Sequence, residues 1–134
     1  MLNYKFKTEP YAHQRKALEV SWEREYFAYF MEMGTGKSKV LIDNAAMLYN
    51  QGKINGLLLI APKGVYKNWY EDQIPTHLPD YINKKIVLWK SSDKTHEQNK
   101  KLNTLFQTGT EFHILIMNVE AFSYDFGKEC ARRF

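Results

Sequence analysis

The residues with the clearest chemical meaning lie between positions 31 and 38, where the sequence reads MEMGTGKS. Gly34 and Gly36 can adopt backbone conformations that a Cβ atom forbids, so successive backbone N–H groups can converge on one anion. Lys37 is placed to reach the β- and γ-phosphates of a nucleotide, and the Ser38 hydroxyl is placed to ligate Mg²⁺. The residues predicted to bind the phosphates are Met33, Gly34, Thr35, Gly36, Lys37 and Ser38.

A loop of this kind needs a strand before it and a helix after it. The apolar, aromatic run at 26–31 predicts the strand. The run at 37–50 predicts the helix, with Leu41, Ala45 and Leu48 at a spacing that turns them towards the core. With both elements in place, the positive end of the helix dipole points at the loop. The competing interpretation is a glycine turn followed by an exposed lysine.

Helices and strands alternate along the rest of the chain. An amphipathic helix is predicted within residues 10–25, with Ala17, Leu18 and Trp22 on one side. The apolar run at 56–61 ends at a proline and predicts a strand buried on both faces. The remaining predicted elements are a helix at 64–74 that stops near Pro75 and Pro79, a strand at 85–89, a helix from Thr95 to Gly109, a strand at 113–117 and a helix towards the C-terminus.

This order predicts an α/β fold with a doubly wound, mainly parallel sheet of about four strands and flanking helices. Right-handed crossovers would place the phosphate loop at the carboxyl ends of the strands, where such sheets bind ligands. A length of 134 residues allows one domain, and a hydrophobic fraction of 44% is that of a globular protein. No apolar run is long enough to cross a membrane, so a cytoplasmic location is expected. The net charge of +4 favours an anionic partner only mildly.

Several segments, taken in order, resemble the first RecA-like lobe of a superfamily 2 helicase or translocase, nearest to the Swi/Snf-type branch. Residues 10–14 resemble the adenine-reading segment of that family, and residues 32–38 resemble its Walker A loop. The full phosphate-loop pattern G-x-x-x-x-G-K-[ST] requires a glycine where this sequence has Met31. The resemblance accounts for this difference, because this superfamily does not use that first glycine. Residues 57–63 are similar to motif Ia, and residues 114–121 are similar to motif Ib.

The resemblance implies that ATP and Mg²⁺ bind at the Walker A loop, with Lys37 and Ser38 as catalytic residues and Ser38 holding Mg²⁺ through the nucleotide. It also implies that Gln14 reads the adenine edge, because an amide can both donate and accept; an exposed helix glutamine is the alternative. Tyr11 is expected either to pack beside the base or to be a buried structural residue. DNA is the implied partner, and the residues implied to contact it are Lys63, Lys67 and Asn118. For the two lysines, a solvated face is the competing interpretation.

The family's next element, a Walker B strand ending in an Asp-Glu pair, has no counterpart in this sequence. The second lobe, which supplies an arginine finger, is absent as well. Residues 1–134 are therefore expected to be the N-terminal portion of a helicase ATP-binding domain that does not hydrolyse ATP alone. Its expected protein partner is the rest of the parent helicase. A rival interpretation treats 114–120 as an altered Walker B strand, with Asn118 in place of the aspartate.

Two functions from other classes compete with the helicase interpretation. A small P-loop kinase would need basic lid and substrate residues that the sequence does not identify. A non-catalytic P-loop module, acting as a decoy that binds DNA or a protein partner, would keep the fold without the chemistry. The four histidines have no metal-ligand spacing, and the single cysteine, Cys130, is expected to be a packing residue.

Overall fold

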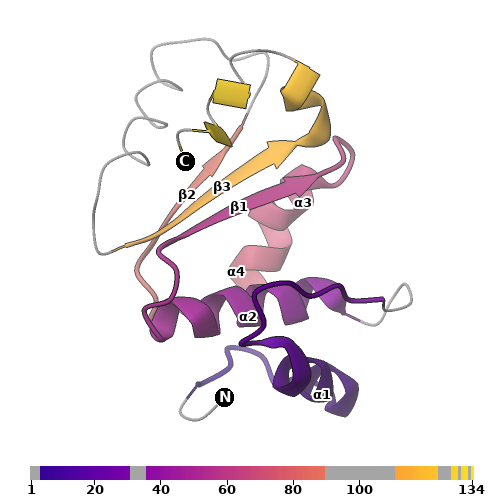
Figure 1. Cartoon of the computed structure of the whole chain (residues 1–134), viewed down its shortest axis with the longest axis vertical. Helices are drawn as coiled ribbons and strands as arrows, with labels where there is room; N and C mark the ends of the chain where they lie inside the picture. Colours follow the sequence, from indigo (N-terminus) through magenta and orange to yellow (C-terminus); the bar gives the residue numbers. More distant parts are fainter. Residues whose placement is uncertain (1–3, 31–35, 90–110, 124–127, 130, 133) are drawn as a thin grey trace. The chain divides into compact units, whose positions relative to one another are not determined.

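The computed structural model describes residues 4–30, 36–89, 111–123, 128–129, 131–132 and 134 (Figure 1). The chain divides into two compact units. The first unit comprises Met1–Ile54 and Asp72–Ile82, and the second comprises Asn55–Glu71 and Asn83–Phe134. The predicted helix from Thr95 to Gly109 and the predicted packing residue Cys130 lie outside the described residues.

The first unit is built around two helices, α1 (Ala12–Ser21) and α2 (Lys37–Asn50). The predicted apolar side of α1 is confirmed, because Leu18 is fully buried and Ala17 and Trp22 pack beside it. The cluster is completed by further apolar and aromatic side chains, namely Val40, Met47, Tyr4, Phe6 and Tyr29. A small core therefore joins the two helices to the residues that precede α1.

Helix α2 has the predicted bounds, but its buried side differs from the predicted one. Ala45 is buried as predicted, whereas Leu41 is 43% exposed, so its predicted orientation towards the core is wrong. Lys39 and Asp43, two charged residues, are buried instead. Apolar periodicity assigns charged residues to solvent, and it fails here because these two side chains neutralise each other inside the unit.

The predicted strand before the phosphate loop does not form in the described residues 26–30, which have no strand partner. Tyr26 and Phe30 are 86% and 97% exposed. Phe27 instead contacts Tyr29 edge to face, with ring centroids 5.0 Å apart, and Arg24 lies 5.7 Å from the Phe27 ring. Aromatic residues favour strands only when a neighbouring strand pairs with them, and no described strand does so here, although Tyr29 packs into the small core of the first unit.

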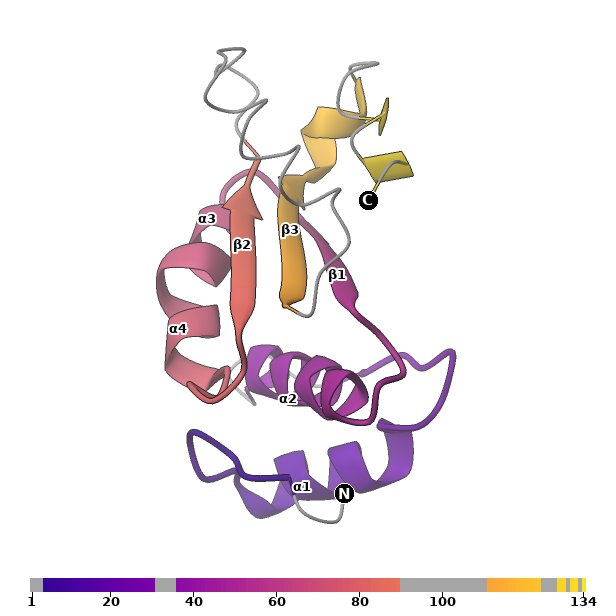
Figure 2. The ribbon, with the colours of Figure 1, turned by 90° about the vertical axis from the view of Figure 1, so that its left-hand side faces the viewer.

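The second unit contains a parallel sheet of three strands: β1 (Gly56–Ala61), β2 (Lys84–Leu88) and β3 (Phe112–Asn118). The spatial order is β1-β3-β2, and the three arrows run in the same direction in Figure 2. The register places Leu58 beside Leu115 and Ile86 beside Ile114. The predicted α/β class and the parallel pairing are therefore confirmed, with three described strands in place of about four.

The middle strand, β3, carries the core of the second unit. Leu115 and Met117 are fully buried and pack with Val87, Trp89 and Ala121. The prediction that the strand at 56–61 is buried on both faces is wrong. Most of β1 is only half-buried, and Ile60 is 47% exposed. The physical reason is position, because β1 is an edge strand of the described sheet whereas β3 is covered by strands on both sides.

A continuous helical run follows β1 and includes a π-helical turn. It consists of α3 (Tyr66–Asn68), the π-helical turn (Trp69–Gln73) and α4 (Ile74–His77). The helix ends at His77, between Pro75 and Pro79, which agrees with the predicted stop near these prolines. After the π-helical turn Pro75 occupies the first turn of α4, where the missing N–H of a proline is not needed. Among the described residues, no helix is long and apolar enough to cross a membrane.

Candidate functional site

The N-terminus of α2 holds the described part of the predicted phosphate site. Gly36 is the N-cap residue, with left-handed backbone angles (φ 79°, ψ 39°). Lys37 and Ser38 occupy the first turn, where backbone N–H groups have no helical acceptor and the helix dipole is positive. The other predicted phosphate-binding residues, Met33, Gly34 and Thr35, lie outside the described residues. The described part of the site thus offers a cation, a hydroxyl and N–H donors to an anion.

Gln14 links the first turn of α1 to this N-cap. Its Oε1 accepts a hydrogen bond from the Tyr11 backbone N–H at 2.8 Å, and its Nε2 donates to the Gly36 carbonyl oxygen at 3.2 Å. The side chain is 4% exposed, so the alternative of an exposed helix glutamine is wrong. The structure therefore brings together two predicted site residues, Gln14 and Gly36, that lie far apart in the sequence.

Replacing Gly36 with alanine is expected to disturb this contact. Alanine in a left-handed conformation costs about 1–2 kcal/mol, and a Cβ at this position would collide with the Gln14 amide nitrogen. Displacing that buried amide costs about 1–3 kcal/mol more. Gly52→Ala is the matched control, because Gly52 also has a positive φ (71°) but a Cβ there meets no atom within 4 Å. The free energy of unfolding of each variant is measured by urea denaturation. Equal losses for Gly36→Ala and Gly52→Ala would show that the new Cβ at position 36 does not collide with Gln14.

Tyr11 and His13 stand beside this contact at the start of α1. Their rings are stacked, with centroids 5.9 Å apart and an interplanar angle of 17°. Tyr11 is 72% exposed, so the alternative of a buried structural tyrosine is wrong. An exposed aromatic face next to Gln14 is suited to packing against a planar base.

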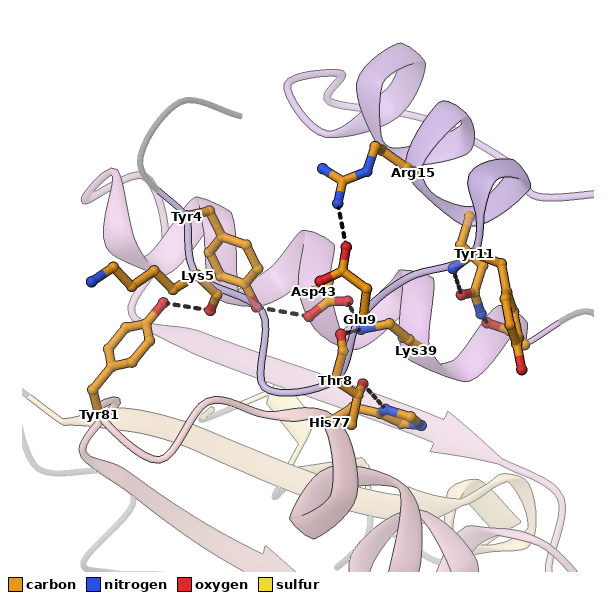
Figure 3. A network of polar contacts seen from close by, with 12 residues as sticks. Tyr4, Lys5, Thr8, Glu9, Tyr11, Arg15, Lys39, Asp43, His77 and Tyr81 are labelled. Atoms are coloured by element: carbon orange, nitrogen blue, oxygen red, sulfur yellow. Dashed lines mark hydrogen bonds and ion pairs between the residues drawn. The ribbon is translucent and has the colours of Figure 1, made fainter.

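A buried polar network lies beneath the first two turns of α2 (Figure 3). The Lys39 ammonium contacts an Asp43 carboxylate oxygen at 2.7 Å and donates to the Thr8 carbonyl oxygen at 2.7 Å. The Tyr4 hydroxyl donates to the other Asp43 oxygen at 2.7 Å. The Lys39 and Asp43 side chains are 5% and 0% exposed. This network was not among the features predicted from the sequence. The signal that could have indicated it is the four-residue spacing of Lys39 and Asp43, which have opposite charges.

Burial dominates the electrostatics of the network. It raises the pKa of Asp43, although hydrogen bonds from Lys39 and Tyr4 act in the opposite direction. Burial and the neighbouring Asp43 carboxylate also raise the pKa of Tyr4, so the tyrosine remains a hydrogen-bond donor. His77 Nδ1 is 2.8 Å from the Thr8 hydroxyl, and burial followed by the Lys39 charge lowers the pKa of His77. Both aromatic groups are thus held neutral next to the ion pair.

The residues predicted to contact DNA lie in the second unit. Asn118 ends β3 beside Ala61, the last residue of β1, so both mark the carboxyl end of the sheet. Asn118 is 2% exposed, and its Oδ1 has no hydrogen-bond partner within the described part of the chain. Lys63 and Lys67 follow β1 and are exposed. The lysines can reach a ligand at the surface, whereas the asparagine is buried.

Two further observations concern possible ligands of the described residues. Among these residues, no group of three or more His, Cys, Asp or Glu side chains could hold a metal. The Ser38 hydroxyl is a suitable oxygen ligand for Mg²⁺ that arrives with nucleotide phosphates. Neither a family model, nor a curated protein, nor a solved structure matches the chain.

Proposed function

We propose that this chain is the ATP-binding portion of a DNA-dependent ATPase, helicase or translocase of superfamily 2, with a P-loop RecA-like fold. One observation carries the proposal: a left-handed Gly36 begins the helix that holds Lys37 and Ser38, and Gln14 binds that glycine. These are residues of two separate motifs in the sequence, and they meet at one helix N-terminus. The parallel sheet of the second unit is compatible with the proposed fold.

The proposed chemistry uses the N-terminus of α2. Lys37 would place its ammonium group on the β- and γ-phosphates, while the first-turn N–H groups bind phosphate oxygens. Ser38 would hold Mg²⁺, which neutralises phosphate charge when it is bound. Tyr11, exposed beside Gln14, would pack against the base. Exposed Lys63 and Lys67 would contact the DNA backbone through its phosphates, an interaction that weakens as salt rises.

The test is a titration of the 134-residue protein with a fluorescent ATP analogue and Mg²⁺. Lys37→Ala is expected to weaken binding by about tenfold to a hundredfold, because a hydrogen bond to a charged group contributes about 1.5–3 kcal/mol. Lys16→Ala, at an exposed lysine on α1, is the control and should bind like the parent. Equal affinity of the parent and Lys37→Ala would refute the assignment of the phosphate site.

ATP turnover separates binding from catalysis. Phosphoryl transfer needs charge neutralisation on both sides of the transferred group, and the described residues supply one side. The chain alone is therefore proposed to bind ATP without hydrolysing it. Turnover by the pure protein that disappears in Lys37→Ala would show instead that this chain holds a complete catalytic site.

A further inference from the structure

The residues before α1 form a strap along the first unit that is neither helix nor strand and bends at Lys7 and Thr8. In this strap, defined as residues 4–9, exposure alternates along the chain: Tyr4, Phe6 and Thr8 are partly buried, while Lys5, Lys7 and Glu9 are exposed. Tyr4 and Phe6 also contact each other edge to face, with ring centroids 4.9 Å apart. The strap therefore presents one continuous inner side to the helices beneath it.

The strap is attached at both its inner and its outer side. The Lys7 ammonium donates to the Pro75 carbonyl oxygen at 2.6 Å and contacts Asp80 at 2.8 Å. Glu9 contacts Arg15 of α1 at 2.9 Å. Together with the hydrogen bond between Thr8 and His77, these contacts fix the strap to α1, to α4 and to the residues after α4.

The strap contacts α2 at two residues, because the Tyr4 hydroxyl donates to Asp43 and the Thr8 carbonyl oxygen accepts from Lys39 in the first turn. Lys39 is the third residue of α2 and follows Ser38 directly. Its ammonium group donates to the Thr8 carbonyl oxygen of the strap and to Asp43 one turn further along the helix. The ammonium group also lies 5.0 Å from the centre of the Phe6 ring. Figure 3 shows Lys39 with its partners Thr8 and Asp43. With the Phe6 ring, two strap residues and the helix itself hold this side chain.

A buried ion pair of this kind is a poor source of stability. The cost of removing both charges from water can exceed their attraction, so two apolar residues of similar size often do as well or better. The raised pKa of Asp43 agrees with this, because it shows that burial outweighs the hydrogen bonds to the carboxylate. Apolar contacts have no preferred direction. The hydrogen bonds of Lys39 do, because they fix its ammonium group to one carbonyl oxygen and one carboxylate.

We propose that the strap and the Lys39–Asp43 pair position the first turn of α2, so that nucleotide affinity at Lys37 and Ser38 depends on residues 4–9. This inference rests on the proposed function, and it adds a positioning device outside the phosphate loop. If the tie from Lys39 to Thr8 is cut, the first turn loses its attachment to the strap. The N–H groups of Lys37 and Ser38 are then held less firmly in the geometry that an anion needs.

The experiment compares the parent with Lys39→Met/Asp43→Leu, which fills the same volume with apolar side chains. Glu129→Leu/Arg132→Met is the matched control, because it removes an ion pair on the surface of the second unit. Hydrogen exchange of the backbone amides of residues 40–43, which donate to the carbonyl oxygens at the start of α2, is measured without nucleotide. Affinity for the ATP analogue is measured separately. A circular dichroism spectrum like that of the parent establishes that each variant is folded.

Exchange of the amides at 40–43 is expected to rise roughly tenfold in Lys39→Met/Asp43→Leu, while that at 47–50 stays unchanged. Nucleotide affinity should fall by roughly tenfold, as when a group that orients a ligand-binding residue is removed. The surface control should change neither quantity. A folded variant with parental exchange at 40–43 overturns the inference, whatever the nucleotide affinity.

Lys39→Met alone tests the same tie if the double variant does not fold. It removes the donor to Thr8, and the remaining Asp43 carboxyl can become neutral by taking up a proton. Faster exchange at 40–43 supports the positioning role, and unchanged exchange overturns it. Failure of the proposed function is recognised independently, because a parent chain whose ATP affinity does not depend on Lys37 refutes the phosphate site alone.

Discussion

Asp43→Asn is expected to lower the free energy of unfolding of the first unit by about 3–5 kcal/mol, the usual cost of removing one partner of a buried ion pair. The cost falls on Lys39, which stays buried with the Thr8 carbonyl oxygen but loses its counter-charge. Lys39→Met/Asp43→Leu should recover most of this loss, because it leaves no buried charge. The two results together would show that the pair is costly to break and unnecessary for folding.

Native-state hydrogen exchange of the slowest amides in α2 measures this effect within the first unit. Asp80→Asn is the control, because Asp80 also pairs with a lysine but its side chain is 79% exposed. A surface pair contributes less than about 1 kcal/mol, so the control should remain near the parent. A loss for Asp43→Asn no larger than that for Asp80→Asn would contradict the buried-pair interpretation.

The contribution of Asp43 to the free energy of unfolding is expected to decrease as the pH rises. Because burial raises the pKa of Asp43, the folded chain holds this proton to a higher pH than the unfolded chain does. The contribution of the group to stability is therefore fully present below its ordinary value of 3.8 and is lost as the pH rises through the folded pKa. Asp43→Asn should remove this slope from a plot of unfolding free energy against pH.

Leu115→Ala is expected to destabilise the second unit by about 2–5 kcal/mol, the range found when a buried leucine is truncated. Leu115 is fully buried in the middle strand and packs in the cluster with Val87 and Met117. Its truncation leaves a cavity in that cluster, and the strands paired on both sides of β3 limit how far the backbone can move to fill it. The loss is measured from hydrogen exchange of the slowest amides in β3.

Ile60→Ala is the matched control in the same sheet. Ile60 lies on the edge strand β1 and is 47% exposed, so its truncation should cost less than about 1 kcal/mol. Similar losses for the two variants would mean that β3 is not the strand on which the core of this unit depends.

Three strands and one long helix could be predicted from the sequence because each is a local pattern. The runs that became β1, β2 and β3 are continuous apolar stretches between turn residues, and α2 follows a glycine and ends near another. Parallel pairing followed from the alternation of helices and strands. The predicted strand at 26–31 failed over 26–30 because a strand also requires a neighbour, which no local pattern supplies.

The candidate site could be predicted in part for the same reason. The residues proposed to bind phosphate form one contiguous motif, so Lys37 and Ser38 could be proposed from the sequence alone. The contact between Gln14 and the Gly36 carbonyl joins two motifs, and the burial of Lys39 depends on a carbonyl oxygen far upstream at Thr8. Contacts of this range follow from tertiary packing, and a single sequence does not show them.

The burial of β3 has a consequence for the unfolded chain. Phe112 to Asn118 is a seven-residue window of apolar and β-favouring side chains without a formal charge at neutral pH, a glycine or a proline. Such windows form intermolecular cross-β stacks once they leave the native sheet. Glu111 and Glu120, which are exposed at its two ends, act as gatekeepers through charge repulsion between stacked copies. The same strand that organises the native core therefore sets the tendency of the unfolded protein to aggregate.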